Sequence, residues 1–195
     1  MTINPILFNT EMVRAILDGR KGATRRIVKG FIPDDAVWGY TAFTHKVYIS
    51  CRGTFADGDG EKFFKLPCEP GDILYVRETW KKAPNGYYYY EDWQRNDIAD
   101  ITKWKPSIHM PKEAARIWLK VMNVRVERLQ EITEVQAQAE GCNSGLLTGA
   151  CTARGQFEDL WNSTVKKSDI DRYGWDANPY VWVISFERCE KPEGV

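Results

Sequence analysis

The segment NPYVWVISF at 178–186 has no charged residue and places apolar side chains on both faces of an extended chain. Because neither face of such a strand favours contact with water, the segment belongs at the centre of a sheet covered on both sides. A second segment, 117–129, alternates Ile117, Leu119 and Val121 with other side chains, the pattern of a strand buried on one face. The sequence therefore predicts a layered protein built around a sheet.

Most of the other periodic segments also predict strands. Strand-like runs occupy 46–51, 62–66, 73–80, 87–90 and 180–188, and helical periodicity is found at about 10–18, 133–140 and 154–165. Thr10 is a candidate N-cap for the first helix, and Thr133 with Gln136 forms a capping-box pattern. Neither a strand–helix alternation nor an internal repeat is present. This favours an α+β fold, a small mixed barrel with helices on its outside, over a doubly wound sheet.

Length and charge limit the class of protein. The 195 residues suffice for one core of ordinary size, and we expect one domain over 1–195 with loop insertions near 30–68 and 81–110. Lys plus Arg and Asp plus Glu each number 27, which excludes a highly basic nucleic-acid coat but not a local basic patch. No apolar run approaches the length of a membrane span, so no membrane partner is expected.

Cysteine usage bears on compartment and on metal binding. The five cysteines are an odd number without a CxxC pair, and only His45 and His109 accompany them. No charged-then-apolar leader opens the chain. These features predict reduced thiols in a cytoplasmic protein, with no zinc site and no other cofactor.

Cationic side chains gather in GRKGATRR, residues 19–26, directly after the first predicted helix. One interpretation is a solvated turn whose three arginines interact favourably with the dipole at the helix C-terminus. The other is a cationic loop that holds a ligand, with Gly19 and Gly22 giving the backbone freedom to curl. In that case the loop creates a locally positive potential on a chain of zero net charge.

The same eight residues resemble the signature of the ASCH domain family, a GxKxx(E/T)xR loop after a first helix. Three further segments are similar to the family in the same order: PGDILYVRETW at 70–80, RVERLQEITEVQAQAEG at 125–141 and WVISFERC at 182–189. The longer forms PSIHMP and WDANPYVWVI are similar to ASCH proteins of bacteriophages and prophages. The resemblance implies a PUA-like β-barrel flanked by α-helices, with RNA or a modified nucleoside as its ligand.

One branch of this family comprises the bacterial N4-acetylcytidine amidohydrolases, which hydrolyse the acetamide on the base of acetylated cytidine. By resemblance, their proposed catalytic set corresponds to Lys21, Thr24 and Glu140. Many other ASCH proteins carry Glu at the position of Thr24, so the resemblance is greater to the hydrolase branch. Gly22 departs from the hydrolases, which usually have Thr there, and so do the insertions. Both departures leave the substrate open.

These residue types are suited to amide hydrolysis. A threonine hydroxyl attacks only after a base takes its proton, and Lys21 is a base only when neutral. Burial and the neighbouring arginines both lower a lysine pKa. Glu140 would orient the lysine or bind the exocyclic amine of the pyrimidine. We therefore expect the helices at 10–18 and 133–140 to flank one cleft, with loop 19–26 at its rim or floor. Lys21 Nζ should lie within hydrogen-bonding reach of the Glu140 carboxylate or one water apart.

Six other side chains are candidates for binding the substrate: Arg20, Arg25, Arg26, Arg77, Glu78 and His109. Arg77 and Glu78 form either a buried ion pair or part of the pocket, and His109 is either structural or in contact with ligand. Three functions remain open. The chain is a hydrolase of acylated cytidine, a non-catalytic PUA-like module that binds RNA or a modified base, or an ASCH-type ribonuclease.

Overall fold

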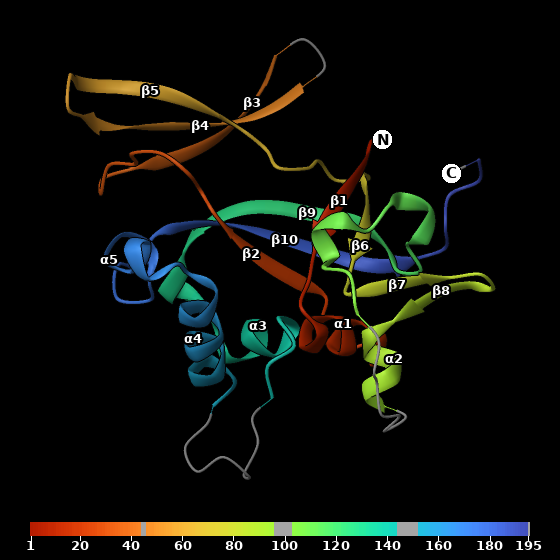
Figure 1. The fold of residues 1–195 in the computed structure, drawn as a ribbon. Coiled ribbons are helices and arrows are strands. Elements are labelled where there is room, and N and C mark those ends of the chain that lie inside the picture. The colour runs from red at the N-terminus through yellow and green to blue at the C-terminus, as the bar shows by residue number, and fades with distance from the viewer. Residues whose placement is uncertain (44–45, 96–102, 144–151, 195) are drawn as a thin grey trace.

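The structure is a computed structural model that describes residues 1–43, 46–95, 103–143 and 152–194. Its largest sheet is five-stranded and mixed (Figure 1). β1 and β6 run parallel, and the other neighbouring pairs are antiparallel. The α+β class predicted from the sequence is confirmed. In spatial order the strands are β1 (Ile3–Leu7), β6 (Ile73–Arg77), β9 (Trp118–Arg128), β10 (Tyr180–Cys189) and β2 (Ala23–Ile27).

Strand β10 lies inside this sheet, as its two-sided apolar pattern predicts. It pairs with β9 on one side and with β2 on the other. Val181 and Val183 belong to one hydrophobic core, whereas Trp182 and Ile184 belong to another. Because successive side chains of a strand point to opposite faces, the two cores lie on opposite sides of the sheet.

The closed barrel expected from the sequence is not formed. Among the described residues no ladder joins the two edge strands, β1 and β2. The ring of Phe8, just after β1, has its centroid 6.2 Å from that of Phe186 and 5.5 Å from Arg26 Cζ. Arg26 Nη2 donates to the Leu7 carbonyl at 3.0 Å. Bulky side chains thus occupy the junction where closure would need backbone hydrogen bonds between strands less than about 5 Å apart.

Helix α1 (Thr10–Leu17) confirms the first predicted helix. Asn9, and not Thr10, is its N-cap, since the Asn9 side chain accepts the Met12 N–H at 2.8 Å. Ile16 enters the core that also contains Ile184.

Helices α3 (Glu134–Ala139) and α4 (Ala153–Thr164) confirm the other two to within one residue at each end. The capping box of Thr133 and Gln136 is present as predicted. Both helices pack against Val181 and Val183 on the face of the sheet opposite to the core of α1. The remaining helical segments are short: α5 (Ile170–Tyr173) and 3₁₀ turns at Ser107–His109, Lys112–Ala114, Leu129–Glu131 and Lys167–Asp169.

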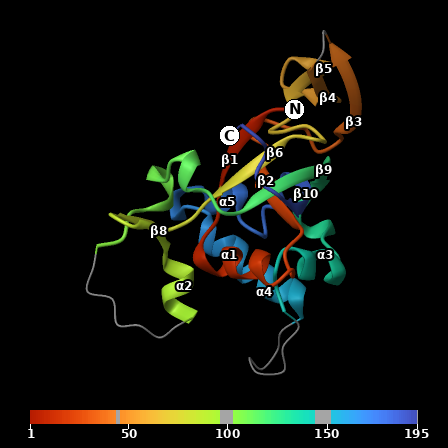
Figure 2. The ribbon, with the colours of Figure 1, turned by 90° about the vertical axis from the view of Figure 1, so that its right-hand side faces the viewer.

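The segment near 30–68 is not a simple loop insertion. It forms a three-stranded antiparallel sheet of β3 (Val37–Phe43), β4 (Lys46–Phe55) and β5 (Gly58–Lys65). This sheet lies beyond β9 and β10, on the side away from α3 and α4 (Figures 1 and 2). Ile49 of β4 is buried in the same core as Ile184, so the small sheet extends the main core.

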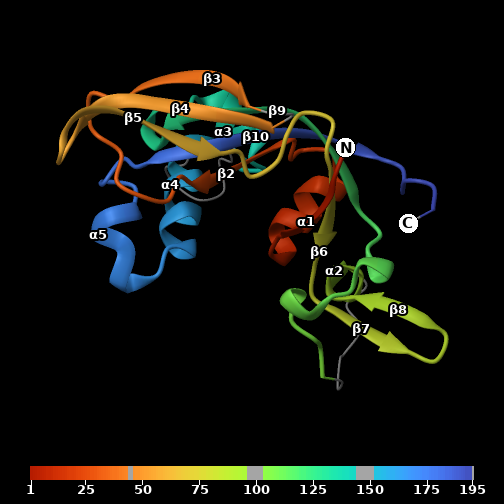
Figure 3. The same ribbon diagram turned by 90° about the horizontal axis from the view of Figure 1, so that it is seen from above.

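The segment near 81–110 also has regular structure. The hairpin of β7 (Trp80–Ala83) and β8 (Gly86–Tyr89) leads into α2 (Tyr90–Arg95), whereas residues 96–102 lie outside the described chain. Seen from above, the hairpin projects away from the main sheet (Figure 3). Trp80 anchors its base in a third core with Trp118.

Candidate functional site

Lys21 is held between the ends of two helices. Just past α1, Gly19 has a φ of +73°, and the Lys21 N–H donates to the Ala15 carbonyl at 3.0 Å. One residue further on, the Gly22 N–H donates to the Ala139 carbonyl at 2.8 Å. The backbone therefore turns at Gly19, as predicted, and carries Lys21 to the C-terminal end of α3, whereas residues 23–26 are extended in β2 and the predicted curl does not reach Thr24.

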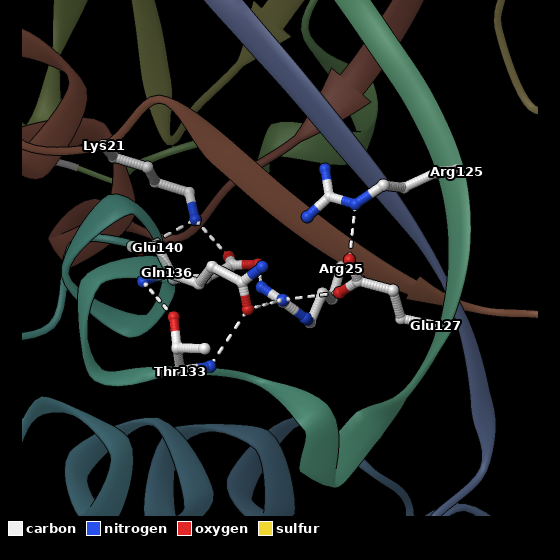
Figure 4. Close-up of polar contacts among 7 residues, drawn as sticks. All are labelled: Lys21, Arg25, Arg125, Glu127, Thr133, Gln136 and Glu140. Carbon is white, nitrogen blue, oxygen red and sulfur yellow. Dashed lines mark hydrogen bonds and ion pairs between the residues drawn. The ribbon is translucent and has the colours of Figure 1, made fainter.

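Glu140 is the C-terminal cap residue of α3, and its side chain faces Lys21 (Figure 4). Lys21 Nζ donates to Glu140 Oε2 and to the Glu140 backbone carbonyl, both at 2.8 Å. The side chain of Lys21 is 0% exposed and that of Glu140 is 3% exposed. The predicted contact is confirmed, and both side chains are almost fully buried.

Arg25 shares the Glu140 carboxylate with Lys21. Its Nη1 donates to Glu140 Oε1, and its Nη2 donates to Glu127 Oε2 and Gln136 Oε1, each at 3.1 Å (Figure 4). Arg125 forms a further ion pair with Glu127. The Arg25 side chain is 0% exposed. This predicted substrate-binding residue thus lies in an ionic network behind Glu140.

Burial lowers the pKa of Lys21 below its usual value of 10.5, although the Glu140 carboxylate acts in the opposite direction. Arg26 contributes to the lowering, and burial also lowers the pKa of Arg26 itself. Both cations lie on the Phe8 ring, with Lys21 Nζ and Arg26 Cζ each 5.5 Å from its centroid. The predicted lowering of the Lys21 pKa is confirmed in direction, and its largest cause is desolvation, not the neighbouring arginines.

Acidic side chains offset the positive potential expected over residues 19–26. Lys21 and Arg25 both bind Glu140, and Arg20 pairs with Asp18 at 3.2 Å. The sequence pattern showed only the cations because Glu140 is far away in the chain. The loop is therefore less electropositive than its composition predicts.

Thr24 lies in β2 opposite Ile184 of β10 and is 1% exposed. Strand alternation places its side chain on the face of β2 opposite to that of Arg25. In the described part of the chain, no hydrogen bond joins the Thr24 hydroxyl to Lys21 or Glu140. The structure brings two of the three predicted catalytic residues together, and a role for Thr24 stays a prediction.

A pocket of about 140 Å³ lies beside the Lys21–Glu140 pair. It lies between α1 and α3, as predicted, with α4 forming another wall. Residues 19–26 do not line it, so this loop is neither its rim nor its floor. Gly141 lines the pocket and also lies against Lys21, since a Cβ on Gly141 would be 3.5 Å from the Lys21 Cβ. The Gly141 turn therefore lies between the pocket and Lys21. The lining residues are Glu11, Met12, Ala15, Glu140, Gly141, Cys142, Gln156 and Leu160.

The other predicted substrate-binding residues do not line this pocket. Arg20 Nη1 donates to the carbonyl of Gly141 at 2.8 Å, on the protein side of the turn. Arg77 Nη1 donates to the Ile108 carbonyl at 3.3 Å, and His109 is exposed. Arg26 reaches the end of β1, as described above.

Glu78 is bound by Arg116 and not by Arg77. Arg116 Nε and Nη2 donate to its two carboxylate oxygens at 2.9 and 3.0 Å. Adjacent residues of an extended chain point to opposite faces, which separates Glu78 from Arg77. Burial raises the pKa of Glu78, against the opposing effect of Arg116.

Sequence reasoning missed this second ionic cluster. Arg116 also binds both oxygens of Asp92 at 2.8 Å, and Arg14 of α1 binds both oxygens of Glu91 at 2.9 and 3.1 Å. The Glu91 side chain is 1% exposed. The cluster fixes α2 to α1. Its only sequence signal is a pair of carboxylates in the aromatic run YYYYED, where burial demands cationic partners.

Among the described residues, no three His, Cys, Asp or Glu side chains gather where they could hold a metal ion. The described cysteines are free thiols, while His45 and Cys151 lie outside the described chain. None of the described helices is both long enough and apolar enough to cross a membrane.

Comparison with known proteins does not identify a family for this chain. No protein-family model matches the chain, and no curated protein matches it. Among solved structures, the crystal structure of hypothetical protein PH0355 is similar over 97% of this chain and 100% of that chain. The two share 13% sequence identity, and the TM-score is 0.42. A likeness this distant carries no argument about family or function.

Proposed function

We propose that the chain hydrolyses the exocyclic amide of an N4-acylated cytidine, with Lys21, Thr24 and Glu140 as the reacting set. The observation that carries the proposal is the buried Lys21–Glu140 pair, whose carboxylate residue also lines a pocket. The resemblance of the 19–26 loop to the ASCH hydrolase branch supplies the substrate class. Burial of the amine supports the chemistry, because a lysine acts as a base only in its neutral form.

In this proposal neutral Lys21 accepts the proton of the Thr24 hydroxyl as its oxygen attacks the amide carbon. The resulting tetrahedral intermediate collapses when the C–N bond breaks, and the Lys21 ammonium returns the proton to the leaving amine. Water then hydrolyses the acyl ester on Thr24 and releases a carboxylic acid. Glu140 holds Lys21 throughout. Because Lys21 is buried behind the Gly141 turn and Thr24 lies on the face of β2 opposite to Arg25, the reaction requires the turn to move aside and the two side chains to approach each other.

A second candidate is a non-catalytic module that binds a modified base in the same pocket. One observation favours it: Lys21 Nζ is bonded to two Glu140 oxygens, whereas Thr24 has no hydrogen bond to Lys21. In this alternative the pair is structural. The ribonuclease alternative needs basic side chains that are available to a phosphodiester, and Arg20, Arg25 and Arg26 are bonded to protein acceptors.

The test is hydrolysis of N4-acetylcytidine, followed by the change in absorbance as cytidine appears. We expect turnover by the native chain and its loss in Thr24→Val, which removes the hydroxyl but keeps the buried volume. Thr41→Val in β3 is the matched control and should retain activity. Saturable binding of the nucleoside without turnover would favour the binding module. Absence of both binding and turnover would contradict the proposal.

A further inference from the structure

The Glu140 carboxylate is divided between two buried cations. Lys21 takes Oε2 at 2.8 Å and Arg25 takes Oε1 at 3.1 Å. Both cationic side chains are 0% exposed. Solvent screens this arrangement only weakly, so the two cations compete for the charge of one carboxylate.

Arg25 is itself held from three elements. Its Nη2 is fixed by Glu127 of β9 and by Gln136 of α3, and its Cζ lies 5.7 Å from the centroid of the Phe157 ring of α4. Gln136 is fixed in turn, because its Oε1 also accepts the Thr133 N–H at 2.9 Å in the capping box. The guanidinium therefore has a set position beside the Glu140 carboxylate.

We propose that Arg25 is a positioning residue for the Lys21–Glu140 pair: by binding Glu140 Oε1 it takes up part of the carboxylate charge, so that Lys21 can release its proton. Arg25 does not line the pocket beside Glu140, and it acts on Lys21 through the Glu140 carboxylate. This role rests on the proposed function, in which Lys21 acts as a base.

The charged and titratable groups that face Lys21 come from α3, from the turn after it and from β2. They are Glu140 at the end of α3, Cys142 in the turn and Arg26 of β2. Toward α1, the Lys21 backbone N–H donates to the Ala15 carbonyl, which carries no titratable charge. Glu140 is the acidic group among these that binds the amine directly. Whatever neutralises Glu140 therefore weakens the hold of the carboxylate on the ammonium.

The direction of the effect follows from this geometry. Without Arg25, the whole charge of Glu140 acts on Lys21, the ammonium is stabilised, and Lys21 loses its proton at a higher pH. Without the charge of Glu127, Arg25 acts on Glu140 alone, and Lys21 loses its proton at a lower pH. A residue that served only to hold β2 against α3 would produce neither shift.

The experiment is a pH titration of Lys21 by NMR in protein with isotopically labelled lysine, with the resonance assigned through Lys21→Met. In Arg25→Met we expect the midpoint to rise by a pH unit or more, which is a tenfold or larger change in proton affinity. Arg116→Met is the matched control, because it removes another arginine bound to two carboxylates and should leave the Lys21 midpoint unchanged. Equal midpoints in Arg25→Met and the native chain would overturn the proposal.

Two further variants keep the test decisive if Arg25→Met does not fold. Glu127→Gln should lower the midpoint, and an unchanged or raised midpoint would contradict the proposal. Arg25→Lys keeps the charge but loses the guanidinium fork, so the midpoint should stay near the native one. In the hydrolysis assay, Arg25→Met should shift the acid limb of kcat to higher pH. If the native chain hydrolyses nothing, the proposed function fails, and the titration still decides the role of Arg25.

Discussion

At the scale of single residues, the ionic groups around Glu140 are the most sensitive part of the molecule. Moving an ion out of water is costly, and attraction between partners repays the cost only when every charge is matched. The network around Glu140 pairs two cations with two carboxylates: Lys21 and Arg25 with Glu140 and Glu127. A loop lysine in an exposed turn contributes little to stability, but Lys21 is not of that kind.

Glu140→Gln should destabilise the protein strongly. The substitution leaves two buried cations, Lys21 and Arg25, without their shared counter-charge, a change that typically costs about 3–5 kcal/mol. Urea denaturation measures the loss in the free energy of unfolding. Glu127→Gln is the control, because Glu127 is 18% exposed and water compensates part of its loss. Equal losses in the two variants would contradict this account.

The stability of the native chain relative to Lys21→Met should depend on pH. Because the folded pKa of Lys21 is lowered, the folded state binds fewer protons than the unfolded state between that pKa and 10.5. Stability due to Lys21 therefore rises with pH across this window, by about 1.4 kcal/mol for each unit of lowering.

Buried thiols work in the opposite direction above pH 9, since burial raises the pKa of Cys68 to about 12. For this reason the measured quantity is the difference in the free energy of unfolding between the native chain and Lys21→Met. The contribution of Cys68 cancels in that difference. A difference that stays constant over the alkaline range would show that the Lys21 pKa is not lowered.

At the scale of elements, short α3 shows how local sequence can set up a distant contact. Gln136 completes the capping box with Thr133 and at the same time accepts a hydrogen bond from Arg25. The cap of a six-residue helix thereby orients a guanidinium that approaches it from β2. We expect the cap to affect both the stability of the helix and the Lys21–Glu140 pair.

Thr133→Ala should cost about 1 kcal/mol of stability, as loss of a threonine cap usually does. Thr152→Ala is the matched control, because Thr152 caps α4 through the Gly155 N–H and should cost a similar amount. Only Thr133→Ala should also change the NMR titration of Lys21, because the Gln136 backbone N–H then loses its acceptor and the first turn of α3, which carries the Gln136 side chain, is held less firmly. If the Lys21 midpoint is the same in Thr133→Ala and Thr152→Ala, the cap of α3 has no influence on the Lys21–Glu140 pair.

The elements that could be predicted from the sequence are those with a one-dimensional pattern. The apolar run of β10 and the caps and spacing of α3 are such patterns. β2 was missed because its ATRRI sequence contains two arginines, and Arg25 is buried only through partners more than a hundred residues away. The family resemblance predicts the contact of Lys21 with Glu140. It does not predict that Arg25 binds the same carboxylate. Long-range ion pairing leaves no periodic signal in a single chain.

At the scale of the whole molecule, the small sheet of β3 to β5 is joined to the main sheet by specific contacts. Trp38 of β3 packs against Tyr180 of β10 with ring centroids 5.2 Å apart, and the Tyr40 hydroxyl donates to the Val124 carbonyl at 3.0 Å. Ile49 is buried in the core of the main sheet. These contacts make the small sheet part of the same core, and one domain over residues 1–195 stays a prediction.

Trp38→Ala tests whether the small sheet unfolds together with the rest. Removal of this indole should lower the free energy of unfolding by about 2–4 kcal/mol, less than the loss of about 3–5 kcal/mol typical of a fully buried Trp, because Trp38 is only partly buried. Because the two sheets share a core, the loss should appear as a lower urea midpoint of one transition, with far-UV circular dichroism and tryptophan fluorescence changing together. Phe63→Ala on β5 is the control: its side chain is 47% exposed, so its loss should cost much less. Two separate transitions in Trp38→Ala would mean that β3 to β5 form an independent unit and that the chain is not a single cooperative domain.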